Sequence, residues 1–94
     1  MIKHIVSFKL KEGESVDKAI EVLKSMEGKV PSALKIEVGK DFLHSARSYD
    51  IILQVTINSR EELDVYQKDE YHCSVVKKHM HEVVESSVAV DYDI

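Results

Sequence analysis

The chain has 94 residues and a net charge of −4, which comes from 13 basic and 17 acidic residues interleaved along the sequence. A chain of this length can bury only one modest hydrophobic core, so we expect a single domain over residues 1–94. The charge excludes nucleic acid as a partner, because phosphate binding needs a basic face, and the one cysteine, Cys73, excludes an internal disulfide and a cysteine-based zinc cluster.

The first ten residues, MIKHIVSFKL, have the alternation of a β-strand. Apolar and polar residues alternate from Ile2 to Leu10, and His4 falls on the apolar side. Lys3 and Lys9 interrupt this stretch and no small-residue cleavage site follows, so we expect neither a signal peptide nor a membrane span. The sequence therefore predicts a first strand in an intracellular, cytoplasmic protein without a membrane partner.

A helix and two strands are predicted next. Ser15 suits the N-cap position, and Asp17 is favourable in the first turn. Apolar residues then recur at helical spacing, at Val16, Ala19, Ile20, Leu23 and Met26. Gly28 and Pro31 end this helix. The segments ALKIEVGKDF and SYDIILQVTI both alternate, which predicts two strands joined by the turn-rich LHSARS.

The last third of the chain repeats the order of helix and strand. Ser59, followed three residues later by Glu62, forms a capping box that opens a second helix through Tyr66. Helical periodicity continues to about Glu82, and SSVAVDYDI returns to a period of two. The predicted order, βαββαβ, is typical of an α+β, ferredoxin-like fold with an antiparallel four-stranded sheet and its helices on one face.

The second face of this sheet remains uncovered in the predicted fold. Its residues are a mixture of branched apolar and polar ones: Ile5, Ser7, Ile52, Gln54, Thr56, Val88 and Val90. Monomeric proteins avoid a bare apolar patch of this kind. We therefore predict a symmetric homodimer in which two sheets meet face to face; the alternative is a monomer with a half-polar outer face.

The stretch YQKDEYHCSVVKKHMH, residues 66–81, gathers three of the five histidines. At about 100° per residue, an unbroken helix places three residues within about 60° of His72, namely Val75, Val76 and His79. The opposite face, which we expect to be solvated, holds Lys77, Lys78 and His81. Tyr66 would lie about 120° from His72, so the two share a pocket only if the helix breaks near the polar run QKDE.

Four segments together resemble the stress-responsive A/B barrel (Dabb) family: MIKHIVSFKLKEG, KIEVGKDFLHSARSYDIIL, VYQKDEYHCSVV and SSVAVDYDI. The resemblance covers essentially the whole chain, and four pieces in order make a specific signal although each alone is weak. It implies a ferredoxin-like protomer that pairs into a dimeric α/β barrel. This expectation agrees with the homodimer that the uncovered apolar face of the sheet predicts.

One branch of that family, the plant polyketide cyclases that make olivetolic acid, resembles the chain at His4, Tyr66 and His72. The resemblance implies that His72 is a general base, that the Tyr66 hydroxyl orients or polarises a carbonyl, and that no metal or organic cofactor takes part. An imidazole suits the removal of a proton beside a carbonyl, and a phenol on the carbonyl stabilises the developing enolate.

The chain departs from the family between these two residues. The family commonly has a His-Pro pair where this sequence reads Asp69-Glu70. A proline there would force the helix break that lets Tyr66 and His72 converge. The two carboxylates also predict an acidic pocket mouth, which would favour a charged imidazolium nearby and suit an anionic substrate poorly.

Two hypotheses follow from the fold and the resemblance. The first is a small-molecule pocket between the sheet and the helices, which binds a ligand or catalyses a cyclase-like or lyase-like proton transfer. Its residues are His72 and Tyr66 as catalytic groups and His4, Val6, Phe8, Ile51 and Val76 as substrate-binding groups. The second is a non-catalytic dimer that acts as a stress-linked binding or scaffold protein, in which His72 is an ordinary core histidine.

A metal-assisted site is the third hypothesis. Asp69, His72 and His79 lie within about 60° on one helical face, which brings three possible ligands together. Two histidines that share a metal on one helix are usually four residues apart, whereas these two are separated by roughly 10 Å of helical rise. His72 and His79 would not both bind one ion directly, so the metal hypothesis ranks below the other two.

Overall fold

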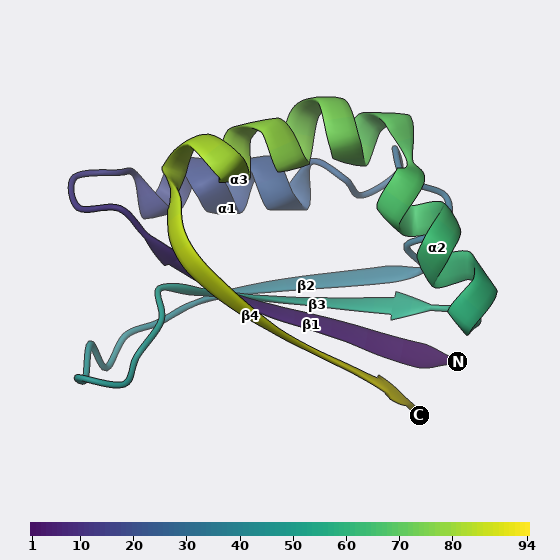
Figure 1. Ribbon diagram of the computed structural model, residues 1–94, viewed down its shortest axis with the longest axis horizontal. Coiled ribbons are helices and arrows are strands. Elements are labelled where there is room, and N and C mark those ends of the chain that lie inside the picture. The colour runs from purple at the N-terminus through teal and green to yellow at the C-terminus, as the bar shows by residue number, and fades with distance from the viewer.

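A computed structural model describes all residues, 1–94, as a four-stranded antiparallel sheet with helices on one side. The elements in chain order are β1 (Ile2–Leu10), α1 (Val16–Lys24), β2 (Lys35–Lys40), β3 (Ile51–Ile57), α2 (Arg60–Lys68), the π-helical segment η1 (His72–Lys77), α3 (Lys78–Val83) and β4 (Val84–Asp93). The strand order is β2-β3-β1-β4. Figure 1 shows the helices above one face of the sheet, which confirms the predicted ferredoxin-like fold.

The predicted helix starts are confirmed by their hydrogen bonds. The Ser15 hydroxyl accepts the backbone N–H of Lys18 at 3.0 Å, and the Ser59 hydroxyl accepts that of Glu62 at 3.2 Å. Each serine thus satisfies an N–H group that has no partner within its own helix. After α1, the chain turns at Gly28, whose φ of 77° is a left-handed conformation that suits glycine.

The register of the strands decides which residues share the inner face of the sheet. Residues directly opposite in an antiparallel pair point to the same side. On the inner face β1 therefore presents three residues toward the helices, His4, Val6 and Phe8. Their β3 partners are Val55, Leu53 and Ile51, and their β4 partners are Asp91, Ala89 and Ser87. This inner face forms the floor of the site.

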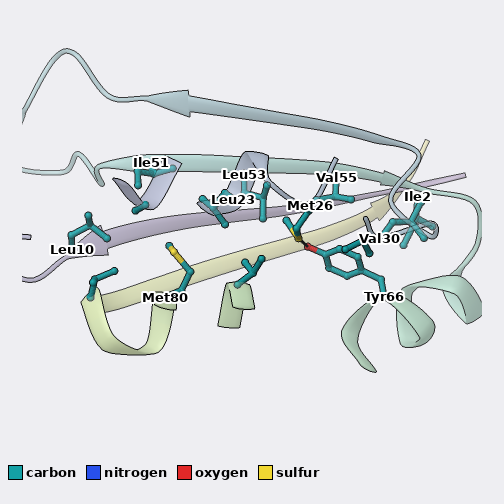
Figure 2. Packing of buried hydrophobic residues seen from close by; sticks show 14 residues of the cluster. Ile2, Leu10, Leu23, Met26, Val30, Ile51, Leu53, Val55, Tyr66 and Met80 are labelled. Atoms are coloured by element: carbon teal, nitrogen blue, oxygen red, sulfur yellow. Dashed lines mark hydrogen bonds between the residues drawn. The ribbon is translucent and has the colours of Figure 1, made fainter. Parts of the chain in front are cut away.

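The hydrophobic core fills the layer between the sheet and the helices (Figure 2). Tyr66 of α2 is among its largest fully buried side chains, with 0% of its surface exposed. Its hydroxyl donates to the Met26 sulfur, Sδ, at 3.7 Å, as the dashed line in Figure 2 shows. The core thus reaches up to the position where α2 meets the helical segment that follows it.

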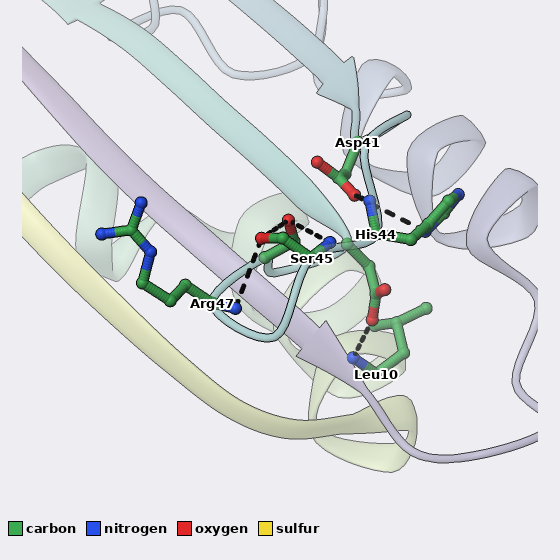
Figure 3. Close-up of polar contacts among 7 residues, drawn as sticks. Leu10, Asp41, His44, Ser45 and Arg47 are labelled. Atoms are coloured by element: carbon green, nitrogen blue, oxygen red, sulfur yellow. Dashed lines mark hydrogen bonds and ion pairs between the residues drawn. The ribbon is translucent and has the colours of Figure 1, made fainter.

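The loop between β2 and β3 is tied to the sheet at its end (Figure 3). The Asp50 carboxylate accepts the backbone N–H of Leu10 at 2.8 Å, which holds the loop against the end of β1. Within the loop, the His44 backbone N–H donates to the Asp41 carboxylate at 2.8 Å. His44 is exposed, so the structure places the second histidine of the chain in solvent, away from the core.

The outer face of the sheet is bare in the single chain. Its apolar residues include Val88 and Val90, which are 54% and 61% exposed, together with Ile52 and Tyr92. The alternation along the sequence therefore assigned Ile52, Val88 and Val90 to the correct face. No helix in the structure has the length and apolar character that crossing a membrane requires.

Candidate functional site

A cavity of about 350 Å³ lies between the inner face of the sheet and the helical segments that cover it. Its walls are largely apolar and come from several elements, with Val6, Phe8, Leu23, Leu53, Val76, Met80 and Val84 among them. Its polar residues are His4, Tyr66, Gln67, His72, Lys77, His81 and Ser87. Because His81 and Ser87 are exposed, the cavity opens to solvent beside β4.

A break in the helix brings Tyr66 and His72 together. α2 ends at Lys68, and Asp69 has an extended backbone with φ −55° and ψ 133°. The Asp69 carboxylate then accepts the backbone N–H of His72 at 2.9 Å and so caps the next helical segment. The break that convergence requires is therefore present without a proline, and the Asp69 side chain caps the helical segment that follows it.

The π-helical segment η1 changes which side chains face the cavity. A π-turn holds more residues than an α-turn, so the phase of the helix shifts along this stretch. Its buried residues follow a spacing of four, four and three, at His72, Val76, Met80 and Val83. Two expectations from a regular helix were wrong as a result: Val75 is 39% exposed, and Lys77 is half-buried and lines the cavity. His81 is exposed as expected, although it borders the cavity.

His72 is held as a neutral base. Its Nδ1 lies 3.0 Å from the backbone oxygen of Tyr66, and a carbonyl oxygen only accepts, so Nδ1 carries the proton and donates it. Nε2 then keeps a lone pair in the cavity. Burial lowers the pKa of His72, and the positive charge of Lys77 acts in the same direction, while the bond to Tyr66 and the Asp69 carboxylate oppose them.

Tyr66 contributes its ring and its backbone to the site. The ring centroids of Tyr66 and His72 are 4.3 Å apart, and those of Tyr66 and His4 are 5.6 Å apart in an edge-on arrangement. Burial, with the Asp69 carboxylate, raises the pKa of the phenol. The hydroxyl points toward Met26 in the core (Figure 2), so the expectation that it polarises a carbonyl in the cavity does not match its position.

His4 is oriented by a carboxylate that sequence reasoning missed. Its Nδ1 pairs with the Asp91 carboxylate, because β1 and β4 are in a register that sets the two residues opposite each other. The carboxylate holds the Nδ1–H and thereby directs the other nitrogen of the ring. Inward alternation of both residues was visible in the sequence, but their pairing depends on the register.

The structure brings most of the predicted site residues to one cavity. Those that line it are His4, Val6, Phe8, Tyr66, His72 and Val76. Ile51 does not, although it was expected among the walls. It is enclosed in the core at 2% exposure, at the end of β3 where it pairs with Phe8 of β1. Leu53, two residues along the same strand, lines the cavity instead.

The expectation of an acidic cavity mouth was wrong. None of the fourteen residues that line the cavity is an aspartate or a glutamate. Asp69 and Glu70 instead border a separate surface depression with Lys29 and Tyr71. The reason is the helix break, which uses the Asp69 side chain as a cap rather than leaving it free to face the cavity.

The residues of the metal hypothesis do not assemble into a ligand set. No group of three or more histidine, cysteine, aspartate or glutamate side chains is placed to hold one ion. His79 does not line the cavity, and its Nε2 is buried without a hydrogen-bond partner. His72 and Asp69 are bonded to the backbone through Nδ1 and a carboxylate oxygen.

Comparison with known proteins gives one family match. The family model described as "Stress responsive A/B Barrel Domain" (Dabb) matches residues 2–94. No curated protein matches the chain at the sequence level.

Solved structures with the same fold cover nearly the whole chain. A dimeric ferredoxin-like protein of unknown function from Bacteroides fragilis has a TM-score of 0.83 and 25% identity, over 99% of this chain and 95% of that one. The Arabidopsis thaliana protein At3g17210 has a TM-score of 0.86 and 18% identity, over 100% and 95%. A hydroxynitrile lyase from Passiflora edulis has a TM-score of 0.85 and 18% identity, over 99% and 92%.

The helix break predicts a measurable cost for losing its cap. Asp69→Ala removes the acceptor of the His72 N–H, so we expect the free energy of unfolding to fall by about 1 kcal/mol in chemical denaturation. Asp69→Asn keeps an acceptor and should restore most of this loss. Glu70→Ala alters an exposed neighbour and should change stability by less than about 0.5 kcal/mol. Equal losses in the two alanine variants would contradict the capping role.

The lowered pKa of His72 predicts a dependence of stability on pH. In the unfolded chain a histidine titrates near its ordinary value of about 6.5, whereas the folded protein resists protonation. The stabilising contribution is thus fully present above about pH 6.5 and is lost as the pH falls toward the folded-state pKa. The stability difference between wild type and His72→Gln should therefore shrink on acidification in urea titrations. A difference that grows on acidification would show that the folded-state pKa is raised instead.

Proposed function

The chain belongs to the stress-responsive A/B barrel domain family, and we propose that its cavity binds a small carbonyl compound and moves a proton on it without a metal or organic cofactor. One observation carries this proposal. The Tyr66 backbone oxygen fixes His72 with its proton on Nδ1, which leaves Nε2 as a neutral base inside a largely apolar cavity. A base in that state can accept a proton at neutral pH.

The proposed step is a proton abstraction beside a carbonyl group. Nε2 of His72 takes a proton from the carbon, the electron pair of the broken C–H bond moves toward the carbonyl oxygen, and an enolate and an imidazolium result. The enolate carbon then attacks a second carbonyl carbon of the same molecule, and the proton returns to the new alkoxide. This sequence closes a ring without any oxidant or reductant.

His4 is the second polar group of the proposed reaction. Its Nδ1 is paired with Asp91, which fixes the ring in the cavity wall, and we place the developing enolate oxygen beside this ring. This assigns to His4 the electrophilic role that the sequence had suggested for the Tyr66 hydroxyl. Tyr66 would instead pack between the two imidazoles and hold His72 through its carbonyl.

Relatives support the class of chemistry, although a shared fold does not transfer an activity. The resemblance to the plant polyketide cyclases at His4, Tyr66 and His72 favours proton transfer on a carbonyl compound. A hydroxynitrile lyase is among the proteins that share the fold. The competing proposal is a dimer that binds a ligand in the same cavity but transfers no proton.

We also propose that two copies of the chain pair through the outer faces of their sheets as a dimeric α/β barrel. The structurally similar protein from Bacteroides fragilis is described as dimeric. The bare outer face of this chain includes the exposed residues Ile52, Val88, Val90 and Tyr92, which a second copy would remove from water. The cavity lies on the other face of the sheet and stays open in such a dimer.

The cavity proposal predicts ligands whose binding and exchange depend on His72. We expect a thermal-shift screen of aromatic acids, β-diketones and acyl thioesters to give compounds that stabilise the wild type and lose this effect in His72→Gln. For the ligands that carry a carbonyl, nuclear magnetic resonance in deuterated water should show protein-dependent deuterium uptake at the carbon beside it. Divalent metals and a chelator should leave this rate unchanged.

His44→Gln is the matched control for this test, because His44 is exposed on the β2–β3 loop and does not line the cavity. It should bind and exchange like the wild type. Binding that requires His72 without any deuterium uptake would favour the non-catalytic dimer. A complete absence of His72-dependent ligands would reject the cavity as a binding site.

The outer face predicts the state of assembly. Light scattering should give a mass near twice the 10.7 kDa of one chain. Val88→Lys places a charge at the centre of the proposed interface, so we expect it to shift the protein toward the monomer. Val65→Lys, an equally exposed valine on α2, should remain dimeric. A wild type that stays at the monomer mass at high concentration would overturn the dimer.

A further inference from the structure

We propose that Lys77 and His81 form an anion subsite at the mouth of the cavity, so that its ligand is a small carboxylate with an apolar body. The inference rests on the proposed function, because it names the class of compound that the same cavity accepts. Lys77 ends η1, and His81 lies four residues later in α3. Residues at this spacing lie on the same side of a helix, and both line the cavity.

The charge around the cavity is opposite to that of the whole chain. The protein has 17 acidic and 13 basic residues, yet the fourteen residues that line the cavity include Lys77 and no carboxylate. Asp91 is paired with His4, and its side chain borders a different depression. An anion that enters the cavity therefore meets an ammonium group and no repelling side chain.

Lys77 is positioned before any ligand arrives. Its side chain is half-buried, and its Nζ donates to the backbone oxygen of Gln67 at 3.0 Å. Gln67 belongs to the last turn of α2, where carbonyl oxygens lack helical partners. An ammonium group has three N–H donors, so two remain for a carboxylate, and the fixed side chain loses little freedom on binding.

The rest of the cavity sets the body of the ligand. Its walls are mostly aliphatic and aromatic, and its volume of about 350 Å³ is at the lower end of the range for small-molecule sites. A single ring or a short chain with one carboxylate fits this description. The arrangement also links the binding of a carboxylate to the basicity of His72. The positive charge of Lys77 helps to lower the pKa of His72, and a bound carboxylate offsets that charge.

Matched acids and amides test the subsite directly. Calorimetric titrations would compare benzoate with benzamide and 4-phenylbutanoate with 4-phenylbutanamide. We expect the wild type to bind each acid about tenfold more tightly than its amide, since hydrogen bonds to charged groups are the stronger ones. Lys77→Met should remove this preference by weakening the acids about tenfold, with the amides unchanged, and Lys77→Arg should restore most of it.

Lys78→Met is the control, because it removes the same charge from an exposed position next in the chain that does not line the cavity. It should bind acids like the wild type. Lys77→Met should also raise the pKa of His72 in a nuclear magnetic resonance titration, because a cation that lowers it is gone.

The outcomes separate this inference from the proposed function. If acids and amides bind equally, and both lose binding in His72→Gln, the cavity proposal stands and the anion subsite is wrong. If Lys78→Met weakens the acids as much as Lys77→Met, the preference comes from net charge and the subsite is again wrong. If neither member of any pair binds, the cavity proposal fails and the subsite fails with it.

Discussion

The hydrogen bond from the His72 backbone to the Asp69 carboxylate holds two helical segments at an angle, and the site depends on that angle. Because α2 ends before Asp69, the carbonyl of Tyr66 accepts the backbone N–H of Asp69 and has a second lone pair for the Nδ1–H of His72. The same break starts the π-helical turn that carries Lys77 to the cavity. An unbroken helix would separate Tyr66 from His72 and close this part of the interior.

The polar groups of the site are held by partners that only accept. His72 donates to a backbone oxygen, and His4 pairs with the Asp91 carboxylate, so each ring uses Nδ1 in a structural contact, which leaves Nε2 for the reaction that we propose. Placing two imidazoles in an apolar layer costs free energy unless such partners are present. Tyr66 fills the space between the rings, edge-on to His4 and tilted against His72, and directs its hydroxyl to Met26 in the core.

The sheet separates two surfaces with different roles. Its inner face supports the cavity together with η1 and α3, and its outer face presents the exposed apolar residues that we assign to a second copy. Side chains alternate along each strand, so neighbouring residues lie on opposite faces. Val88 therefore lies on the outer face, in the proposed interface, while Ser87 lines the cavity. Family membership fixes the architecture, whereas the chemistry depends on the side chains of this cavity.

The sequence by itself determined the order of elements, the N-caps at Ser15 and Ser59, and the composition of both sheet faces, because these depend on local periodicity and local hydrogen bonds. It also indicated that His4, Tyr66 and His72 converge if the helix breaks. Only the tertiary structure decided the pairing of His4 with Asp91, because strand register cannot be read from alternation. It also decided that Lys77 faces the cavity. A π-turn holds more residues than the 3.6 of an α-turn, so it rotates the side chains relative to the directions that α-helical spacing predicts.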